Sequence, residues 1–200
     1  MQYAEHGQDP YCYPRTSILR NVPGIQDASL LQRFETEVTQ WQQIAMELEP
    51  VKGGFDLPHL CEIHRRLFQS VYAWAGELRT VDISEDSTRF AHYLYIRSYS
   101  EGFFQKLTEE RKSWVHGTPP DAFSYRLAEY LGEINAVHPF REGNRRAQRI
   151  FIGQLAEAYG VRLSWEKITP QQMLEASIAS MTSDVTLLAQ LIEQCSIKLR

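Results

Sequence analysis

The chain has 200 residues, 43% of them hydrophobic and 12% aromatic, so it can build a substantial core and is not intrinsically disordered. Its 21 basic and 25 acidic side chains give a net charge of −4, which argues against a general nucleic-acid-binding protein. No apolar run reaches the roughly 20 residues that cross a bilayer, no secretion signal opens the chain, and three widely spaced cysteines exclude a disulfide scaffold. We therefore expect a single cytoplasmic domain over residues 1–200, with no membrane and no direct nucleic-acid contact.

The strongest pattern in the chain is helical. Apolar residues recur every three or four positions from Ser29 to Glu49, which predicts a long helix after an N-terminal arm over about residues 1–28. Ser29 and Gln32 could form a capping box at its start, and Pro50 stops it. A second helix is predicted from Pro58 to Tyr72, because proline is well tolerated in a first helical turn.

The pattern changes to a period of two between about residues 80 and 95. Alternation over 79–84, turn residues at 85–87 and a second alternation over 89–95 predict a short β-hairpin. Helical patterns then follow over 96–115, 121–137 and 144–159, the last capped by Gly160, and further helices are expected after Thr169 and after Asp184. The expected fold class is therefore mostly α with one short β-hairpin.

The segment from Ala136 to Arg149 carries the clearest chemistry. Pro139 cannot continue the helix before it, so His138 is expected at a helix end, where its ordinary pKa suits proton transfer near neutral pH. Gly143 leaves the backbone uncovered, and Asn144 is a good N-cap for the next helix. A glycine-bearing turn that leads into a helix N-terminus is a ready site for an anion.

Arginines are concentrated in the same segment. Four of the sixteen in the chain lie within residues 141–149, where an even distribution would put fewer than one. Arginines in a first helical turn oppose the helix dipole, at about 0.3–1 kcal/mol each where exposed, and a phosphate among them would explain this cost. Glu142 would repel that phosphate unless a hard cation such as Mg²⁺ lay between them. Together with His138, the set predicts a nucleotide-dependent transfer site.

Each of these features alone is more often structural. A lone histidine at a helix end is commonly a partner of the helix dipole, and a cluster of arginines is commonly a solvated face. Because all of them lie within residues 138–149, a single site that combines the histidine, the carboxylate and the arginines is favoured.

The sequence His138-Pro-Phe-Arg-Glu-Gly-Asn-Arg-Arg-Ala-Gln-Arg149 resembles the signature of Fic-domain proteins, His-Pro-Phe-x-(Asp/Glu)-Gly-Asn-(Gly/Lys)-Arg-x-x-Arg. Asp9-Pro-Tyr-Cys-Tyr-Pro, Trp74-Ala-Gly-Glu-Leu-Arg and Glu133-Ile-Asn also look like this family, so the resemblance covers nearly the whole chain. It implies a helical Fic core with a β-hairpin flap. The implied activity is that of a protein adenylyltransferase, which moves AMP from ATP, with Mg²⁺, onto a hydroxyl side chain of a target protein.

The resemblance also implies a role for each signature residue. His138 would be the catalytic base, Glu142 would hold Mg²⁺, and Phe140 would anchor the loop in the core. In the flap, Phe90 would clamp a target segment that adds to the hairpin as a strand. The nucleotide-binding residues would be Arg141, Gly143, Asn144, Arg145, Arg146 and Arg149.

Arg145 departs from the signature, because most members have Gly there and the Doc subgroup has Lys. A cation at this position could mimic the Doc lysine, with which the nucleotide binds reversed and its γ-phosphate is transferred. Phosphoryl transfer to a protein therefore stays open beside AMP transfer. A non-catalytic binding module is a third hypothesis, although every other defined polar position of the signature is present.

The family commonly carries an inhibitory helix with the pattern (Ser/Thr)-x-x-x-Glu-(Gly/Asn), whose glutamate pairs with the arginine that matches Arg149. The Glu-Gly pairs at Glu101 and Glu142 lack Ser or Thr four residues earlier, and the chain has no Glu-Asn pair. The resemblance therefore implies a stand-alone bacterial toxin that a small antitoxin silences in trans. It also suggests type II DNA topoisomerase subunits as targets.

Two other groups of residues favour structural roles. Cys61, Glu62 and His64, with His59 nearby, are more typical of one helix with a core face and a surface face than of a zinc site. The aromatic residues between Tyr93 and Trp114 are expected to pack rather than to stack on bases.

Overall fold

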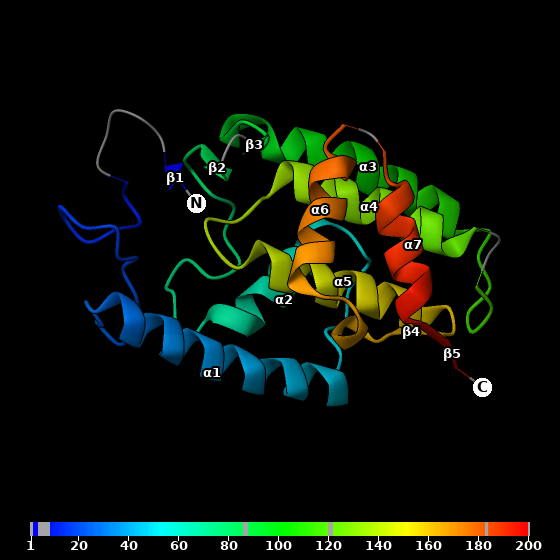
Figure 1. The fold of residues 1–200 in the computed structure, drawn as a ribbon, viewed down its shortest axis with the longest axis horizontal. Coiled ribbons are helices and arrows are strands. Elements are labelled where there is room, and N and C mark those ends of the chain that lie inside the picture. The colour runs from blue at the N-terminus through cyan, green and yellow to red at the C-terminus, as the bar shows by residue number, and fades with distance from the viewer. Residues whose placement is uncertain (1, 4–8, 86–87, 120–121, 183, 200) are drawn as a thin grey trace.

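The computed structural model describes residues 2–3, 9–85, 88–119, 122–182 and 184–199 (Figure 1). Its helices are α1 (Ala28–Leu48), α2 (Leu57–Phe68), α3 (Ile96–Arg111), α4 (Phe123–Val137), α5 (Asn144–Ala158), α6 (Pro170–Ser180) and α7 (Thr186–Cys195). Short 3-10 helices, η1 (Tyr93–Tyr95) and η2 (Trp165–Lys167), precede α3 and α6. None of the helices in these ranges has the length and apolarity that crossing a bilayer requires. The expectation of a mostly helical fold is confirmed.

Two small antiparallel sheets accompany the helices. The flap sheet has the order β1 (Gln2–Tyr3), β2 (Ile83–Glu85), β3 (Thr88–Arg89), and in its register Ser84 lies opposite both Gln2 and Arg89. The second sheet pairs β4 (Val161–Leu163) with β5 (Ser196–Lys198). The sequence predicted only the hairpin of β2 and β3, because strands of two or three residues are too short to show alternation.

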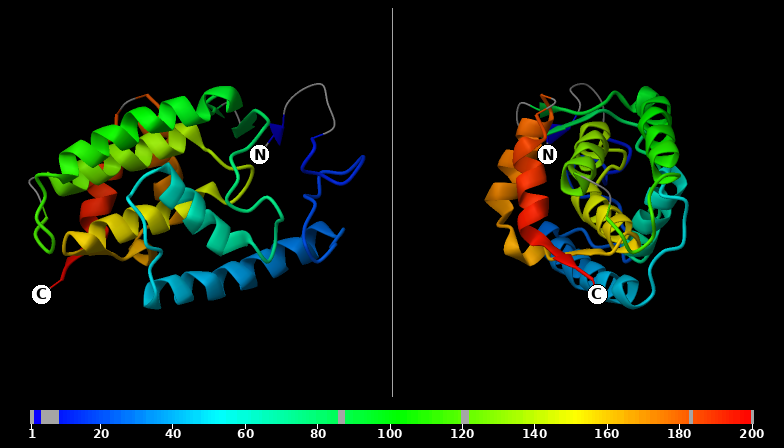
Figure 2. Two further views of the ribbon diagram at one scale, coloured as in Figure 1. Left: turned by 180° about the vertical axis from the view of Figure 1, so that it is seen from behind. Right: turned by 90° about the vertical axis from the view of Figure 1, so that its right-hand side faces the viewer.

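The helices α4 and α5 lie at the centre of the molecule. Viewed end-on, they are surrounded by α1, α2, α3 and the pair α6 and α7 (Figure 2). α4 packs on α3, α5 and α7, while α5 also packs on α2 and β4. Leu127 and Ile134 of α4 and Phe151 and Ile152 of α5 are fully buried. The loop between α4 and α5 is therefore held between the two most enclosed helices of the fold.

Capping side chains determine where the helices begin. The side chain of Asp27 accepts the N–H of Leu30 at 2.8 Å and caps α1, so the expected capping box of Ser29 and Gln32 is wrong. Asp56 caps α2 in the same way, with Pro58 in the first turn as predicted. Thr169 caps α6 in a capping box with Gln172, and Gly160 follows α5 with φ of +83°, as predicted. The Asp184 carboxylate accepts the Thr186 N–H at 3.0 Å, but the N-cap residue of α7 is Val185.

Two helices end earlier than the periodicity predicts. α2 ends at Phe68 instead of Tyr72, because the N–H groups of Val71 and Tyr72 both bond to the Phe68 carbonyl and close a turn. α3 ends at Arg111 instead of Val115, since the next three N–H groups bond three residues back rather than four. The predicted start of α4 at Asp121 lies outside the described residues, and the helix is described from Phe123.

The flap is shorter than the alternation over 79–84 and 89–95 predicts. β2 begins at Ile83 and β3 ends at Arg89, because the backbone on either side bonds to the α4–α5 region instead. The Ala91 N–H donates to the Ala136 carbonyl at 3.0 Å, and the Arg79 N–H donates to the Pro139 carbonyl at 2.9 Å. The base of the flap is therefore bonded to the segment that contains His138. The predicted turn residues 86 and 87 lie outside the described residues.

Candidate active site

His138 lies directly after the last residue of α4, as the sequence predicts. It ends the helix in the left-handed conformation, with φ of 48° and ψ of 63°, and its N–H donates to the Ile134 carbonyl at 2.9 Å. A residue other than glycine is uncommon in this conformation, so the surrounding structure must hold it. The side chain is completely buried.

The imidazole of His138 has one nitrogen bonded and one free. Nδ1 lies 3.2 Å from the carbonyl oxygen of Asn135, so Nδ1 carries the proton and Nε2 carries a lone pair. Nε2 is buried and has no hydrogen-bond partner among the described residues. Burial, reinforced by the positive charges of Arg145 and Arg79, lowers the pKa of His138 from 6.5 to about 3. The ring is therefore neutral at physiological pH and can accept a proton at Nε2.

Phe90 of the flap covers this ring. The two ring centroids are 3.8 Å apart and the planes differ by 16°, which is a parallel stack. Phe90 follows β3 directly, so the flap brings an aromatic side chain from 48 positions upstream onto the predicted base.

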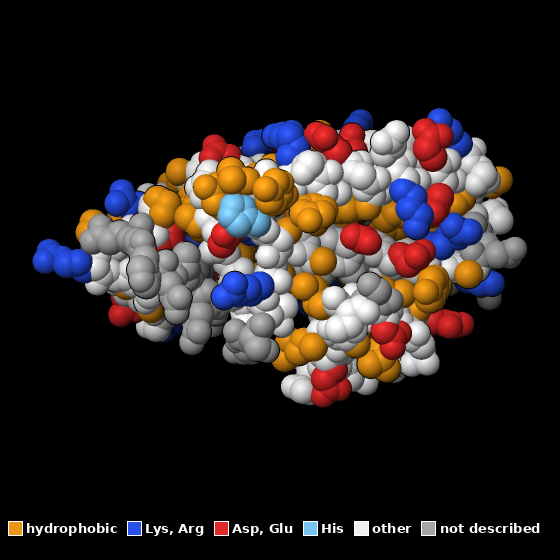
Figure 3. All heavy atoms as spheres, turned by 90° about the horizontal axis from the view of Figure 1, so that it is seen from above, with side chains coloured by type: hydrophobic (Ala, Val, Ile, Leu, Met, Phe, Trp, Pro, Cys, Tyr) orange, Lys and Arg blue, Asp and Glu red, His pale blue; other side chains and the backbone are white. Residues whose placement is uncertain are grey.

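A hydrophobic patch flanks the flap on the outer surface. Leu94, Tyr95 and Tyr99 are exposed, and His92 stacks on Tyr93 with centroids 4.9 Å apart. Figure 3 shows hydrophobic side chains gathered around a histidine on this side of the molecule. The expectation that these aromatics pack inside is therefore wrong for Tyr95 and Tyr99, although Phe104 and Trp114 do join the core.

Phe140 and Asn144 brace the loop. Phe140 is 1% exposed, as expected for an anchor. Its N–H donates to Asn144 Oδ1 and its carbonyl accepts from Asn144 Nδ2, both at 2.8 Å. Both groups of the Asn144 side chain are thus used across the loop, and the expectation that Asn144 caps α5 is wrong. The residue at the N-cap is Gly143.

Gly143 is required at its position for two reasons. Its φ of +79° is in the left-handed region, and a Cβ there would lie 2.3 Å from the ring of Phe68. Its N–H donates to Oε1 of Glu142 at 2.9 Å. The turn thereby places the Glu142 carboxylate beside the first turn of α5.

His64 of α2 supports the same loop, a role that the sequence analysis did not predict. Its Nε2 donates to the Glu142 carbonyl at 2.9 Å, and its Nδ1 accepts the Gly76 N–H at 2.9 Å. Its ring also stacks on Phe140 with centroids 3.9 Å apart. Burial lowers the pKa of His64 to about 3, so it is neutral, as this pair of bonds requires.

The four arginines of the signature have different surroundings. Arg141 is fully buried and donates through Nε and Nη2 to Asp9 of the N-terminal arm, at 3.0 and 2.6 Å. Arg145 donates to Glu85 of the flap at 2.6 Å. Arg146 bonds to Glu35 and, at 2.9 Å, to Thr39, both on α1.

Arg149 has no hydrogen bond or ion pair to any residue that the structure describes. It is half-buried, and burial together with the charges of Arg146 and Arg145 lowers its pKa. An arginine remains protonated at neutral pH, so this guanidinium is a cation available to a ligand.

A cavity of about 400 Å³ unites most of the predicted site. It is lined by Glu85, Glu142, Gly143, Asn144, Arg145, Arg146 and Arg149. All the residues expected to bind nucleotide or metal line it except Arg141, which faces Asp9 instead. Three arginines, a helix N-terminus and the Glu142 carboxylate suit a phosphate chain with a divalent cation, because Mg²⁺ is usually bound by one or two carboxylates together with phosphates. The second carboxylate of the lining, that of Glu85, accepts from Arg145.

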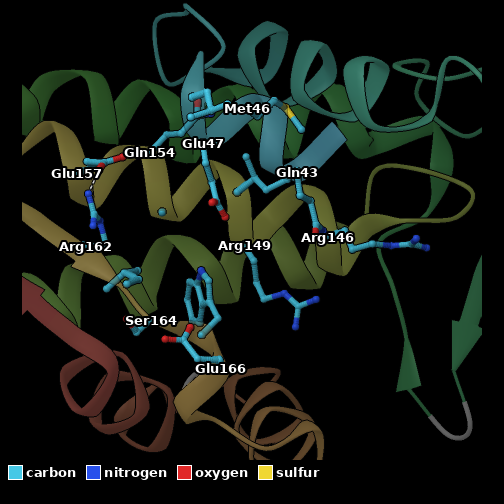
Figure 4. Close-up of a pocket in the computed structure, with 15 residues that line it drawn as sticks. Gln43, Met46, Glu47, Arg146, Arg149, Gln154, Glu157, Arg162, Ser164 and Glu166 are labelled. Atoms are coloured by element: carbon cyan, nitrogen blue, oxygen red, sulfur yellow. Dashed lines mark hydrogen bonds and ion pairs between the residues drawn. The ribbon is translucent and has the colours of Figure 1, made fainter. Parts of the chain in front are cut away.

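A larger cavity of about 760 Å³ adjoins the first and shares Arg146 and Arg149 with it. It is a groove between α1, α5 and the segment from Arg162 to Glu166 (Figure 4). Met46, Glu47 and Leu48 of α1 form one wall, and Trp165 lies opposite. The side chain of Arg149 extends toward this space without a bond to the residues around it (Figure 4).

The chain is similar to known proteins of one family. The model of the Fic/DOC family matches residues 54–156. Protein adenylyltransferase VbhT of Bartonella schoenbuchensis is 40% identical over 194 residues, which are 97% of this chain but only 40% of that longer protein. Probable protein adenylyltransferase Fic of Salmonella typhimurium is 40% identical over 188 residues, which are 94% of this chain and 92% of that one.

A solved structure shares the whole fold. The N-terminal Fic domain of a VirB-translocated Bep effector protein from Bartonella quintana, with bound ADP, has a TM-score of 0.85, 26% identity and 95% coverage of both chains. With its signature loop between α4 and α5, its flap and these relatives, the chain belongs to the Fic/DOC family.

Proposed function

We propose that the chain is a protein adenylyltransferase that moves AMP from ATP onto a hydroxyl side chain of a target protein. The observation that carries the proposal is the free Nε2 of a neutral, buried His138 on the same loop as a cavity lined by three arginines. The names of the relatives and the ADP in the Bartonella quintana structure support the same chemistry.

In the proposed reaction, Nε2 of His138 accepts the proton of the target hydroxyl as its oxygen attacks the α-phosphorus of ATP. The bond between the α-phosphorus and the bridging oxygen breaks, and pyrophosphate leaves. Arg146, Arg149 and the N–H groups at the start of α5 would hold the leaving phosphates. Arg141 supports the site indirectly, because its pair with Asp9 fixes the loop to the N-terminal arm.

Glu142 is the residue that would hold Mg²⁺. Its carboxylate lines the phosphate cavity, with one oxygen bonded to the Gly143 N–H. When bound, Mg²⁺ neutralises phosphate charge that would otherwise repel this carboxylate.

The flap would bind the target. β3 is the outer strand of the flap sheet in the order β1-β2-β3, so an extended target segment can add beside it. The ring of Phe90 lies on the ring of His138, so it would have to shift to admit a hydroxyl to Nε2. We assign Phe90 the role of a clamp that packs on the target once it has shifted.

Phosphoryl transfer is the second candidate, and Arg145 is the observation that favours it. Arg145 lines the phosphate cavity at the position where the Doc subgroup has a lysine. A nucleotide bound in the reverse direction would present its γ-phosphate to the target hydroxyl.

We further propose that the chain is a toxin of the bacterial cytoplasm and that a small antitoxin silences it. The antitoxin would place a helix in the groove beside α1, where its glutamate pairs with Arg149, a cation without a bond to any described residue, and competes with phosphate. The proposed targets are subunits of type II DNA topoisomerases.

The test uses ATP labelled at the α- or the γ-phosphate with purified DNA gyrase and topoisomerase IV, followed by mass spectrometry. Label from the α-position alone, lost in His138→Ala with ATP affinity intact, supports the proposal. Transfer of γ-label would establish the second candidate, and ATP binding without any transfer to a protein would favour a binding module.

A further inference from the structure

Arg79 is a buried cation outside the signature. Its side chain has no exposed surface, although it lies in a connecting segment between α2 and β2. Burial lowers its pKa to about 10, so it remains protonated at physiological pH. Among the described residues the nearest carboxylate is that of Asp82, 3.7 Å away and itself 45% exposed, so none of them neutralises the charge of Arg79 as a buried partner.

Backbone carbonyl oxygens take the place of such a partner. Nε donates to the carbonyl of His138 at 2.8 Å, and Nη2 donates to that of Val137 at 3.1 Å. Nη1 donates to the carbonyl of Val81 at 2.7 Å, and Nη2 also donates to that of Ala91. The first two carbonyls end α4 and would otherwise lack partners, and a cation at a helix C-terminus is stabilising.

These bonds reach two different functional segments. Val137 and His138 are the last turn of α4 and the candidate base, whereas Val81 and Ala91 flank the two strands of the flap. Ala91 is next to Phe90, whose ring lies on the ring of His138. One planar guanidinium with five donors can join four carbonyls in a fixed geometry, which a lysine cannot do.

We propose that Arg79 is the positioning residue that fixes the base and the flap to one common anchor. It holds His138 in its left-handed conformation and sets the place of Phe90 relative to it. Arg79 lines neither the phosphate cavity nor the larger groove beside it, so it acts on the reaction through His138 and the flap and not through the nucleotide. This inference rests on the proposed function for its catalytic consequence, while the common anchor can be tested without any activity.

The test compares Arg79→Lys and Arg79→Gln with Arg111→Lys as a matched control. Arg111 is a partly buried arginine that, like Arg79, donates to a backbone carbonyl, that of Gly54 at 2.6 Å, but it lies away from the loop and the flap. Hydrogen exchange is followed at the N–H of Ala91 and of His138, which bond to the Ala136 and Ile134 carbonyls. Calorimetry measures the Kd for ATP, and α-labelled ATP measures kcat and KM for transfer.

Both Arg79 variants are expected to speed exchange at Ala91 and His138 together and to lower kcat about 100-fold, with the Kd for ATP unchanged. Arg111→Lys should change none of these. The inference is overturned if Arg79→Lys keeps the wild-type kcat, if only one of the two amides loses protection, or if ATP affinity falls in step with kcat.

Two further results test the role of Arg79 even if the variants do not fold or the chain transfers no AMP. In the wild-type chain, low urea should accelerate exchange at Ala91 and His138 in parallel, and different urea dependences would refute the common anchor even if no variant folds. Should the wild-type chain transfer no AMP, the proposed function fails, and the exchange measurements still decide whether Arg79 joins the two segments.

Discussion

The ring of Phe90 lies flat on the imidazole of His138, with the centroids 3.8 Å apart. The candidate base is thus shielded from water by the flap that is proposed to bind the target. Phe90→Ala should expose the imidazole and raise the pKa of His138 from about 3 toward 6.5, because burial is the largest cause of its depression. Titration of the ring by NMR measures this. Tyr95→Ala, which removes an exposed ring that contacts His92 and not His138, should leave the pKa unchanged.

Arg149→Ala should weaken ATP binding, because it removes a cation that has no other partner among the described residues. The loss of a charge-assisted contact corresponds to about 1.5–3 kcal/mol, or roughly 10- to 150-fold in Kd by calorimetry. Arg33→Ala removes an exposed cation from α1 and controls for net charge. Equal affinities in the two variants would contradict the phosphate site.

Gly143→Ala should destabilise the fold. The left-handed backbone costs an alanine about 1–2 kcal/mol, and the contact of Cβ with Phe68 adds about 1–3 kcal/mol of overpacking. Urea unfolding measures the change. Gly102→Ala is the control, because its Cβ would meet nothing within 4 Å inside α3, and it should stabilise by about 0.5–1 kcal/mol. If Gly143→Ala leaves the free energy of unfolding unchanged, the turn can relax to accept a side chain.

The stability of the fold should fall in mild acid. His64 and His138 have a pKa of about 3 when folded and an ordinary pKa of 6.5 when unfolded, so below pH 6.5 the unfolded chain binds more protons. Their contribution is complete above pH 7 and decreases as the pH falls from 6.5 toward 3. At pH 5.5 each of the two histidines lowers the free energy of unfolding by about 1.4 kcal/mol.

Urea unfolding at pH 7.5 and pH 5.5 checks this difference. His64→Gln removes one titrating group, so the difference between the two pH values should shrink by about 1.4 kcal/mol. His138 and His59, whose pKa burial also lowers, still contribute to the remaining difference. A wild-type chain that is equally stable at both values would show that neither histidine is held neutral.

The sequence predicted the features that are local in the chain. Helical periodicity located α1 through α5 to within a few residues, and capping residues indicated where α6 and α7 begin. The short signature predicted that Glu142, Arg145, Arg146 and Arg149 would share one site. The errors are also local in origin: Asp27 competes with Ser29 as a cap, and Asn144 bonds across its own loop instead of capping α5.

What the sequence did not predict depends on contacts between distant segments. His64 bonds to a loop 78 positions away, Arg79 to one 59 positions away, and Glu35 to an arginine 111 positions away. Nothing in the neighbourhood of Glu35 or Glu85 distinguishes them from other surface acids until the fold brings α1 and the flap beside α5. A histidine or an arginine within an apolar stretch indicates a buried polar contact, but the sequence does not show which residue that contact is with.

The ion pairs of Arg145 with Glu85 and of Arg146 with Glu35 make ligand binding an exchange of counter-ions. A phosphate chain that engages these guanidinium groups displaces carboxylates of the protein itself, whereas at Arg149 it displaces ions from solution. Fewer dissolved ions are therefore released than the three arginines would imply. The logarithm of ATP affinity should consequently fall only gently with the logarithm of salt concentration, and replacing Glu85 by glutamine should steepen that slope.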